Sequence, residues 1–214
     1  MMMNEAGRRV ARWCVASLMV LFTVPAVAAD AREQLQRFVS EVSSAQGRFT
    51  QQVAGVQGDA RPQQSGEFSF QRPGKFRWHV LKPYEQLVIS DGKLLRQFDP
   101  DLAQLTERPV DQSIGASPAA ILFGSGRLED AFELTSQPDR DGLVWLRARP
   151  KSGDAGFTHV DIGFAEGLPQ RLELLDAFGQ TTRITLSDMQ PNVKLAAEAF
   201  DFKAPADVDV VTMQ

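Results

Sequence analysis

The sequence predicts a mainly β protein, in which one strongly curved antiparallel sheet is accompanied by a few short helices. Most of the chain consists of short segments in which apolar and polar residues alternate, as in strands that bury one face. A Pro-Gly pair at residues 73–74 and an Asp-Gly pair at 91–92 supply turn signals between such segments. Only residues 30–42 and 114–126 have the spacing or composition of helices.

The first 29 residues form a predicted secretory signal peptide. Three arginines give it a positive start, and residues 13–24 are apolar but too short to span a bilayer comfortably. The small residues that follow allow cleavage after Ala28 or Ala29. A retained membrane anchor is the alternative interpretation of this segment.

The mature chain, residues 30–214, is expected to be an exported, soluble, single domain. The only cysteine, Cys14, lies at the start of the apolar segment, so it is not placed like a lipoprotein acylation site and is removed with the signal. Cleavage removes three arginines and one glutamate, which leaves 20 basic and 26 acidic residues and a net charge of −6. This charge argues against nucleic acid or an anionic membrane surface as the main partner.

A helix is predicted at the start of the mature chain, over residues 30–42. Asp30 is the expected N-cap, with Glu33 three residues further on. Four apolar residues share one face at helical spacing: Leu35, Phe38, Val39 and Val42. Such a one-sided helix is suited to lie against an apolar surface.

The strands are predicted in a regular series after this helix. The expected segments are residues 47–55, 68–80 (a hairpin), 85–99 (a second hairpin), 102–108, 131–137, 142–150, 157–164, 169–179 and 180–190. The alternation is cleanest, with polar residues between, at Thr158, Val160, Ile162, Phe164, Thr182, Ile184 and Leu186. Strands this regular, each with one apolar face, favour a single antiparallel sheet.

The hairpin of residues 68–80 places an arginine on an otherwise apolar face. Period-two alternation puts Phe68 and Phe70 on the same face as Arg72. The second strand of the hairpin has its own apolar face, made of Phe76, Trp78 and Val80. An inward charge without a partner is costly, so Arg72 either lies on a rim or meets a specific partner.

A short helix that is apolar on almost every side is predicted within residues 114–126. Ser117 is the expected N-cap and Pro118 the first helical residue. Its apolar residues are Ala119, Ala120, Ile121, Leu122 and Phe123. Two interpretations stay open: a plug in the open mouth of the curved sheet, or a fixed core helix that closes one end of a barrel. Residues 127–132 add one further helical turn.

The sequence contains no recognisable catalytic, cofactor-binding or metal-binding arrangement. His79 and His159 both fall on the predicted polar faces of strands, where solvated histidines are expected. Residues 99–101 have turn chemistry, and Asp207 and Asp209 form a charged C-terminal edge rather than a metal site. The expected class is therefore a binding protein, with an enzyme that uses paired carboxylates in a cleft as the alternative. If the helices do not cover the sheet completely, an apolar hollow suited to acyl chains remains.

Several motifs identify a family resemblance. An Arg-Pro-x-x-Phe-x-Trp motif is formed by Arg72, Pro73, Phe76 and Trp78. Further characteristic stretches are residues 88–93, 49–51, 117–118, 200–202 and 205–210. Through these motifs the chain closely resembles the periplasmic outer-membrane lipoprotein carriers of the LolA family, above all over residues 65–106. The resemblance extends across the whole mature chain.

The resemblance implies an unclosed antiparallel β-barrel of about eleven strands, covered by a lid of short helices. In that family the concave apolar face receives the acyl chains of lipoproteins, which an inner-membrane ABC transporter releases and a LolB-type acceptor in the outer membrane takes over. The implied protein is a periplasmic, monomeric chaperone without enzymatic activity or cofactor. The implied cavity and mouth residues are Phe49, Phe68, Phe70, Phe76, Trp78 and Val80.

The resemblance also implies specific roles for Arg72 and for one of these residues, Phe76. Arg72 is expected to hydrogen-bond backbone carbonyls of the lid helix, at residues 120–123, and so to hold the empty carrier shut. Phe76 is expected at the cavity mouth, where it engages the transporter. The lid departs from the family in carrying Ala119 and Ala120 where bulkier residues are expected, which implies a less tight cover.

Proteins with the same scaffold can have other functions. The outer-membrane acceptor should carry a cysteine just after its signal peptide, and this chain has none there. A carrier of another lipid, a glycolipid or a free fatty acid stays open, because acyl chains look alike to an apolar cavity. A stress-sensing module that binds mislocalised lipoproteins usually has an additional domain.

Overall fold

The computed structural model describes residues 30–56, 61–110, 128–153 and 156–212. The expected signal peptide and the expected lid helix, residues 119–123 included, lie outside these described residues. The helical turn expected after the lid is present as α3 (Leu128–Ala131).

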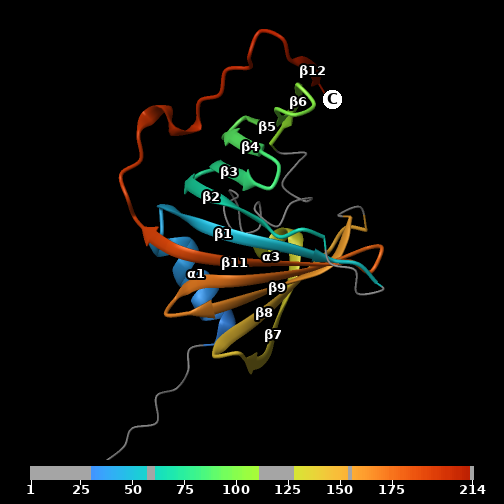
Figure 1. The fold of residues 1–214 in the computed structure, drawn as a ribbon. Coiled ribbons are helices and arrows are strands. Elements are labelled where there is room, and N and C mark those ends of the chain that lie inside the picture. The colour runs from blue at the N-terminus through green and yellow to red at the C-terminus, as the bar shows by residue number, and fades with distance from the viewer. Residues whose placement is uncertain (1–29, 57–60, 111–127, 154–155, 213–214) are drawn as a thin grey trace, which may run out of the picture.

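Twelve strands form one continuous sheet in the described part of the chain (Figure 1). The strands are β1 (Ser44–Ala54), β2 (Gln64–Gln71), β3 (Lys75–Lys82), β4 (Gln86–Asp91), β5 (Leu94–Asp99), β6 (Gln104–Pro109), β7 (Phe132–Arg140), β8 (Leu143–Pro150), β9 (Phe157–Ala165), β10 (Leu168–Asp176), β11 (Thr181–Pro191) and β12 (Asp209–Thr212). Their order across the sheet is β12-β6-β5-β4-β3-β2-β1-β11-β10-β9-β8-β7. Because β12 and β7 are the two ends of this order, the sheet does not close, and the predicted unclosed barrel is confirmed.

The twelfth strand was not predicted. β12 pairs in parallel with β6, whereas every other pair in the sheet is antiparallel. The C-terminal segment reaches β12 by leaving β11 and running along the outside of β2–β5 (Figure 1). Residues 207–209 were interpreted as a charged edge; the strand that starts at Asp209 is held by its backbone pairing, since all four of its side chains are exposed.

Helix α1 (Ala31–Glu41) confirms the predicted one-sided helix. Leu35, Phe38 and Val42 are buried, and the helix lies across β7–β10 on the face that we call the inner face of the sheet. The expected N-cap is wrong in one respect, because the Asp30 side chain makes no capping hydrogen bond. It accepts a hydrogen bond from the Ser136 hydroxyl on β7 instead, which ties the helix to the edge of the sheet.

The turn between β4 and β5 lies one residue later than the Asp-Gly signal predicted. Gly92 and Lys93 connect the two strands, and Gly92 has a φ of +93°. The Asp91 carboxylate accepts hydrogen bonds from the backbone N–H groups of Lys93 and Leu94, at 2.8 and 2.9 Å. Asp91 thus ends the strand and closes the turn with its side chain, rather than occupying a central turn position.

The inner face carries the main core, and the opposite, outer face carries a second apolar layer. The outer layer includes Leu87 and Ile89 on β4, which share a face with the polar side chains of β3. The 3₁₀ helix η2 (Ala197–Phe200) packs over β3 and β4, and Phe200 is fully buried there. The C-terminal segment therefore covers an apolar patch on the outer face. The strands were predicted to bury one face only, so this patch was not expected.

Candidate functional site

The six residues expected to line the cavity and its mouth lie together on the inner face. Phe49, Phe68, Phe70, Phe76 and Val80 are buried, and Trp78 is partly buried against them. The Trp78 ring on β3 stacks on the Phe49 ring of β1 with 3.7 Å between centroids, and the centroid of the Phe68 ring on β2 lies 6.1 Å from that of Trp78. Alternation along the strands thus gathers these side chains into one aromatic surface.

Two glycines that the sequence analysis did not single out allow this aromatic surface to form. A Cβ atom on Gly66 would lie 1.9 Å from the backbone oxygen of His79 and 2.9 Å from the Phe49 ring. A Cβ atom on Gly47 would lie 2.7 Å from the Phe68 ring. An isolated glycine within a strand often marks such a close approach, but the predicted strands began at residues 47 and 68, so neither glycine lay inside one.

Arg72 lies in the turn after β2, at the end of the aromatic surface. Its Nε donates a hydrogen bond to the backbone oxygen of Val42 at 3.1 Å. Its guanidinium lies over the rings of Phe38 and Phe70, 5.3 and 5.1 Å from their centroids. Burial lowers the pKa of the Arg72 guanidinium, which nevertheless stays charged because its ordinary pKa is so high.

Arg72 therefore meets specific partners, which is one of the two interpretations of its inward position; the other was a place on the rim. A carbonyl oxygen and two aromatic faces compensate the desolvated charge. The expected acceptors at residues 120–123 lie outside the described residues. Among the described residues, the Arg72 side chain donates to the backbone oxygen of Val42, at the end of α1.

The two histidines are less solvated than expected. His79 Nε2 lies 2.8 Å from Glu85 Oε1, and its side chain is mostly buried. His159 is partly buried, and its Nδ1 has no hydrogen-bond partner among the described residues. Burial, and then the nearby Arg147, lower the pKa of His159 and favour the neutral ring. Within the described ranges, no group of three or more His, Cys, Asp or Glu side chains is arranged to hold a metal ion.

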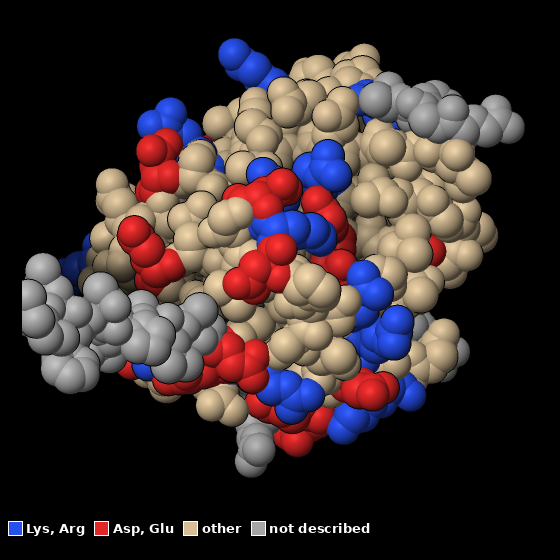
Figure 2. Space-filling model, turned by 90° about the horizontal axis from the view of Figure 1, so that it is seen from below, with Lys and Arg blue, Asp and Glu red and all other residues tan. Residues whose placement is uncertain are grey.

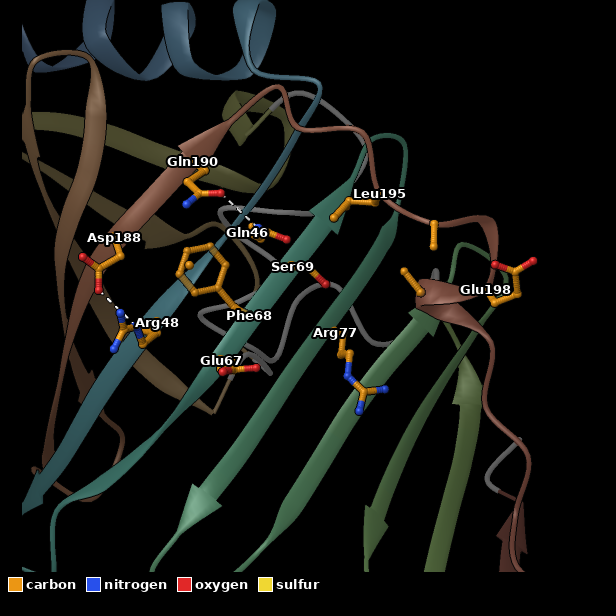
Figure 3. Close-up of a pocket in the computed structure, with 13 residues that line it drawn as sticks. Gln46, Arg48, Glu67, Phe68, Ser69, Arg77, Asp188, Gln190, Leu195 and Glu198 are labelled. Atoms are coloured by element: carbon orange, nitrogen blue, oxygen red, sulfur yellow. Dashed lines mark hydrogen bonds and ion pairs between the residues drawn. The ribbon is translucent and has the colours of Figure 1, made fainter.

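A cavity of about 620 Å³ lies on the outer face (Figure 3). Its floor comes from β1, β2, β3 and β11, and one wall is the C-terminal segment at residues 195–199. Arg48 pairs with Asp188 at 3.1 Å across this floor, and Gln46 donates to the Gln190 side chain at 3.0 Å. The polar, oppositely charged lining suits water or polar groups, so the inner face is the better candidate for an apolar ligand.

Comparison with known sequences decides the family. Residues 40–203 match the family model described as "Outer membrane lipoprotein carrier protein LolA". The chain belongs to the LolA family. Its inner aromatic face and the adjacent arginine come from the same stretch of sequence that carries the family motifs.

Relatives within the LolA family are similar over nearly the whole chain. An outer-membrane lipoprotein carrier protein of Bordetella avium is 59% identical over 204 residues, covering 95% of this chain and 98% of the relative. Its namesake in Bordetella pertussis is 55% identical over 212 residues, covering 99% of both chains. The outer-membrane lipoprotein carrier protein of Cupriavidus pinatubonensis is 48% identical over 201 residues, covering 92% of this chain and 95% of the relative.

Solved structures with low sequence identity share the LolA fold. An uncharacterised conserved protein of Thermus thermophilus has a TM-score of 0.56 at 16% identity, covering 86% of this chain and 99% of its own. A LolA superfamily protein of Nitrosomonas europaea has a TM-score of 0.51 at 13% identity, covering 82% and 99%. At these identities the likeness establishes the fold alone. Among the described residues, no helix combines the length and apolar character needed to cross a bilayer.

The outer face of this LolA-family chain also carries a charge network that the sequence analysis missed. Asp161 on β9 is buried and bonds Arg147 on β8 through both carboxylate oxygens, each at 2.7 Å. Arg140 lies 3.6 Å from Asp161 and 2.8 Å from Glu173, and also covers the buried Trp145 ring at 3.7 Å. Figure 2 shows acidic and basic side chains interleaved on one face of the molecule. The network neutralises itself and rigidifies this half of the sheet.

Proposed function

We propose that this chain is a periplasmic carrier that binds the acyl chains of lipoproteins on its inner face and delivers them to the outer membrane. The observation that carries the proposal is the aromatic inner surface of an unclosed sheet, with its inward arginine. A surface of this kind binds by shape and apolar burial, without a nucleophile or a bound metal. The names of the family and of its close relatives support the same role.

The proposal includes two partner proteins and no nucleic acid. The chain receives acylated lipoproteins from an inner-membrane ABC transporter and passes them, as a monomer, to a LolB-type acceptor in the outer membrane. Phe76 is the proposed contact near the mouth for the transporter. The proposed lid, Ala119 to Phe123, covers the inner face when no cargo is bound, and Arg72 holds it there.

The energetics of acyl-chain burial explain why such a carrier needs an exchangeable cover. Burying one saturated chain of about sixteen carbons contributes roughly 12 kcal/mol. Several chains in a permanently open, dry cavity would not be released. A lid that refills the inner face competes with the cargo, since its own apolar side chains are buried again when the lipid leaves. Each lid hydrogen bond to Arg72 adds about 1 to 3 kcal/mol to the closed state.

The proposal is tested by analysing what the exported protein carries. Parent and Arg72→Leu are purified from the periplasm without detergent and compared by intact-mass and lipid mass spectrometry. We expect triacylated lipoprotein on the variant and little on the parent, because the variant accepts cargo but lacks the interaction that favours closure. Arg77→Leu is the matched control: it removes an arginine from the outer face of the same hairpin and should resemble the parent.

Two outcomes would contradict the proposal. Phospholipid or glycolipid on both the parent and Arg72→Leu would support a carrier of another lipid. An equal lipoprotein load on Arg72→Leu and Arg77→Leu would remove the special role of Arg72.

A further inference from the structure

The connection between α1 and β1 is held from two sides by residues that are distant in sequence. Val42 and Ser43 form this connection, between Glu41 at the end of α1 and Ser44 at the start of β1. On one side, Arg72 donates from its Nε to the oxygen of Val42 and from its backbone N–H to the oxygen of Ser43, at 3.1 and 2.8 Å. The turn after β2 is thereby attached to the end of α1.

Asn192, directly after β11, holds the same connection from the other side. Its Oδ1 accepts hydrogen bonds from the backbone N–H and the hydroxyl of Ser43, at 2.9 and 3.3 Å. Its Nδ2 donates to the oxygen of Glu41 at 3.0 Å, and its backbone N–H donates to the oxygen of Ser44. The Ser44 hydroxyl adds a bond to the oxygen of Val193 at 2.7 Å.

These contacts replace the capping that α1 lacks locally. The last carbonyls of a helix have no partner within the helix, and a following glycine or a basic residue in the last turn commonly satisfies them. Helix α1 is followed by Val42 and has no basic residue in its last turn. Arg72 and Asn192 supply the donors instead. Asn192 has a φ of +57°, a left-handed conformation that asparagine tolerates better than most residues.

We propose that Asn192 is a positioning residue for Arg72. Ser43 is bound through its N–H by Asn192 and through its carbonyl by Arg72, so Asn192 fixes the orientation in which the oxygens of Val42 and Ser43 face the arginine. The inference rests on the proposed carrier function, because it assigns to Asn192 an effect on the arginine that controls cargo. It also couples the start of the C-terminal segment to the inner face.

Asn192→Gly is the decisive variant, because glycine adopts the positive φ without strain and removes only the side-chain bonds. Asp188→Gly is the matched control: it removes another positive-φ side chain, which is 58% exposed, remote from residues 41–44 and on β11 just before Asn192. Each protein is loaded with a fluorescent tripalmitoyl-cysteinyl peptide. Transfer of this peptide to phosphatidylethanolamine–phosphatidylglycerol vesicles is then timed.

We expect transfer by Asn192→Gly to slow about fivefold, the effect of losing one hydrogen bond, in the direction of Arg72→Leu. The double variant with Arg72→Leu should be no slower than Arg72→Leu alone, because both substitutions act on one interaction. Asp188→Gly should transfer at the parent rate.

Hydrogen exchange of the Arg72 amide separates positioning from a merely structural role. If Asn192 orients Ser43, this amide exchanges faster in Asn192→Gly than in Asp188→Gly, although Asn192 does not touch it. The proposal is wrong if only the Ser43 amide exchanges faster in Asn192→Gly and the transfer rate of this variant equals that of Asp188→Gly. If the parent does not bind the lipopeptide, the proposed function fails, and the Arg72 amide still decides whether Asn192 positions Arg72.

Discussion

Trp78 is the side chain around which the aromatic inner surface is organised. It stacks on Phe49 and lies near Phe68, so three strands contribute rings to one contact. Offset stacking of this kind stabilises a fold beyond the burial of apolar area alone. Trp78 is partly buried, and its ring belongs to the inner face that the proposed function assigns to the acyl chains.

Replacement of Trp78 by alanine should therefore affect both stability and ligand binding. We expect Trp78→Ala to lower the free energy of unfolding by about 2 to 4 kcal/mol, toward the low end of large-to-small aromatic substitutions because the site is partly exposed. Urea unfolding measures the change. Tyr84→Ala is the control, since Tyr84 is 68% exposed and its loss should change stability by less than about 0.5 kcal/mol. Equal effects of the two substitutions would refute the structural role of the stack.

His159 makes stability depend on pH. Burial and Arg147 hold its pKa below the ordinary value of 6.5, with Arg149 acting in the same direction and Asp161 against them. The unfolded chain therefore binds a proton at a higher pH than the folded chain does. The free energy of unfolding therefore has its full value above pH 6.5. It decreases as the pH falls through 6.5 toward the lower pKa of the folded state, because protonation favours the unfolded chain.

We expect the parent to lose more stability than His159→Gln when the pH is lowered from about 7.5 to 5. Urea unfolding at a series of pH values gives the two slopes. Parallel curves for the parent and His159→Gln would show that the ring is not desolvated enough to matter.

At the scale of the elements, the pairing of β2 with β3 depends on a glycine. The register of the two strands shifts between Ser65 and Gly66, and the backbone of His79 approaches Gly66 so closely that a Cβ atom would overlap its oxygen. Since the obstacle is backbone and not the end of a flexible side chain, the strands must move apart to admit any other residue.

Gly66→Ala should accordingly cost about 2 kcal/mol or more, as substitutions that force backbone shifts do. Gly153→Ala is the matched control, because a Cβ atom there meets nothing within 4 Å. Thermal unfolding of both variants provides the comparison. A Gly66→Ala protein as stable as Gly153→Ala would mean that β2 and β3 can separate without cost.

The elements also differ in how far the sequence could predict them. The one-sided helix and the alternating strands follow from periodicity, and so does the placement of Phe68 and Phe70 on one face of their strand. The outer apolar layer at Leu87 and Ile89 was missed, although three consecutive apolar residues at 87–89 are a signal of a strand buried on both faces.

Some features had no local signal in the sequence. The partners of Arg72 among the described residues depend on how a turn meets the end of α1, thirty residues earlier in the chain. Asn192 lies about 150 residues from the carbonyl that it caps, and nothing near it in sequence indicates that contact. Parallel pairing of β12 with β6 likewise results from the path of the whole C-terminal segment. Long-range contacts of this kind depend on tertiary structure, which periodicity does not encode.

At the scale of the whole molecule, the two faces of the sheet differ in chemistry. The outer face is held by its own ion pairs, and the C-terminal segment packs over part of it. The inner face presents aromatic side chains toward α1, between two sheet ends that do not pair with each other. Under the proposed function, a stable outer layer would let the inner face bind and release its cargo without unfolding of the sheet.

If the ligand binds the inner face, its apolar area should determine how much it raises the melting temperature. A ligand that binds only the folded protein raises its stability according to concentration and affinity. We expect the melting temperature to rise with a tripalmitoyl-cysteinyl peptide, to rise less with the monopalmitoylated form, and to be unchanged by the peptide without acyl chains. The order follows from apolar area, at about 0.8 kcal/mol per buried methylene. Trp78→Ala should reduce the shift because it removes inner-face surface, whereas Arg77→Leu on the outer face should leave it intact. An equal shift with the unacylated peptide would show that the protein recognises the polypeptide and not its lipid.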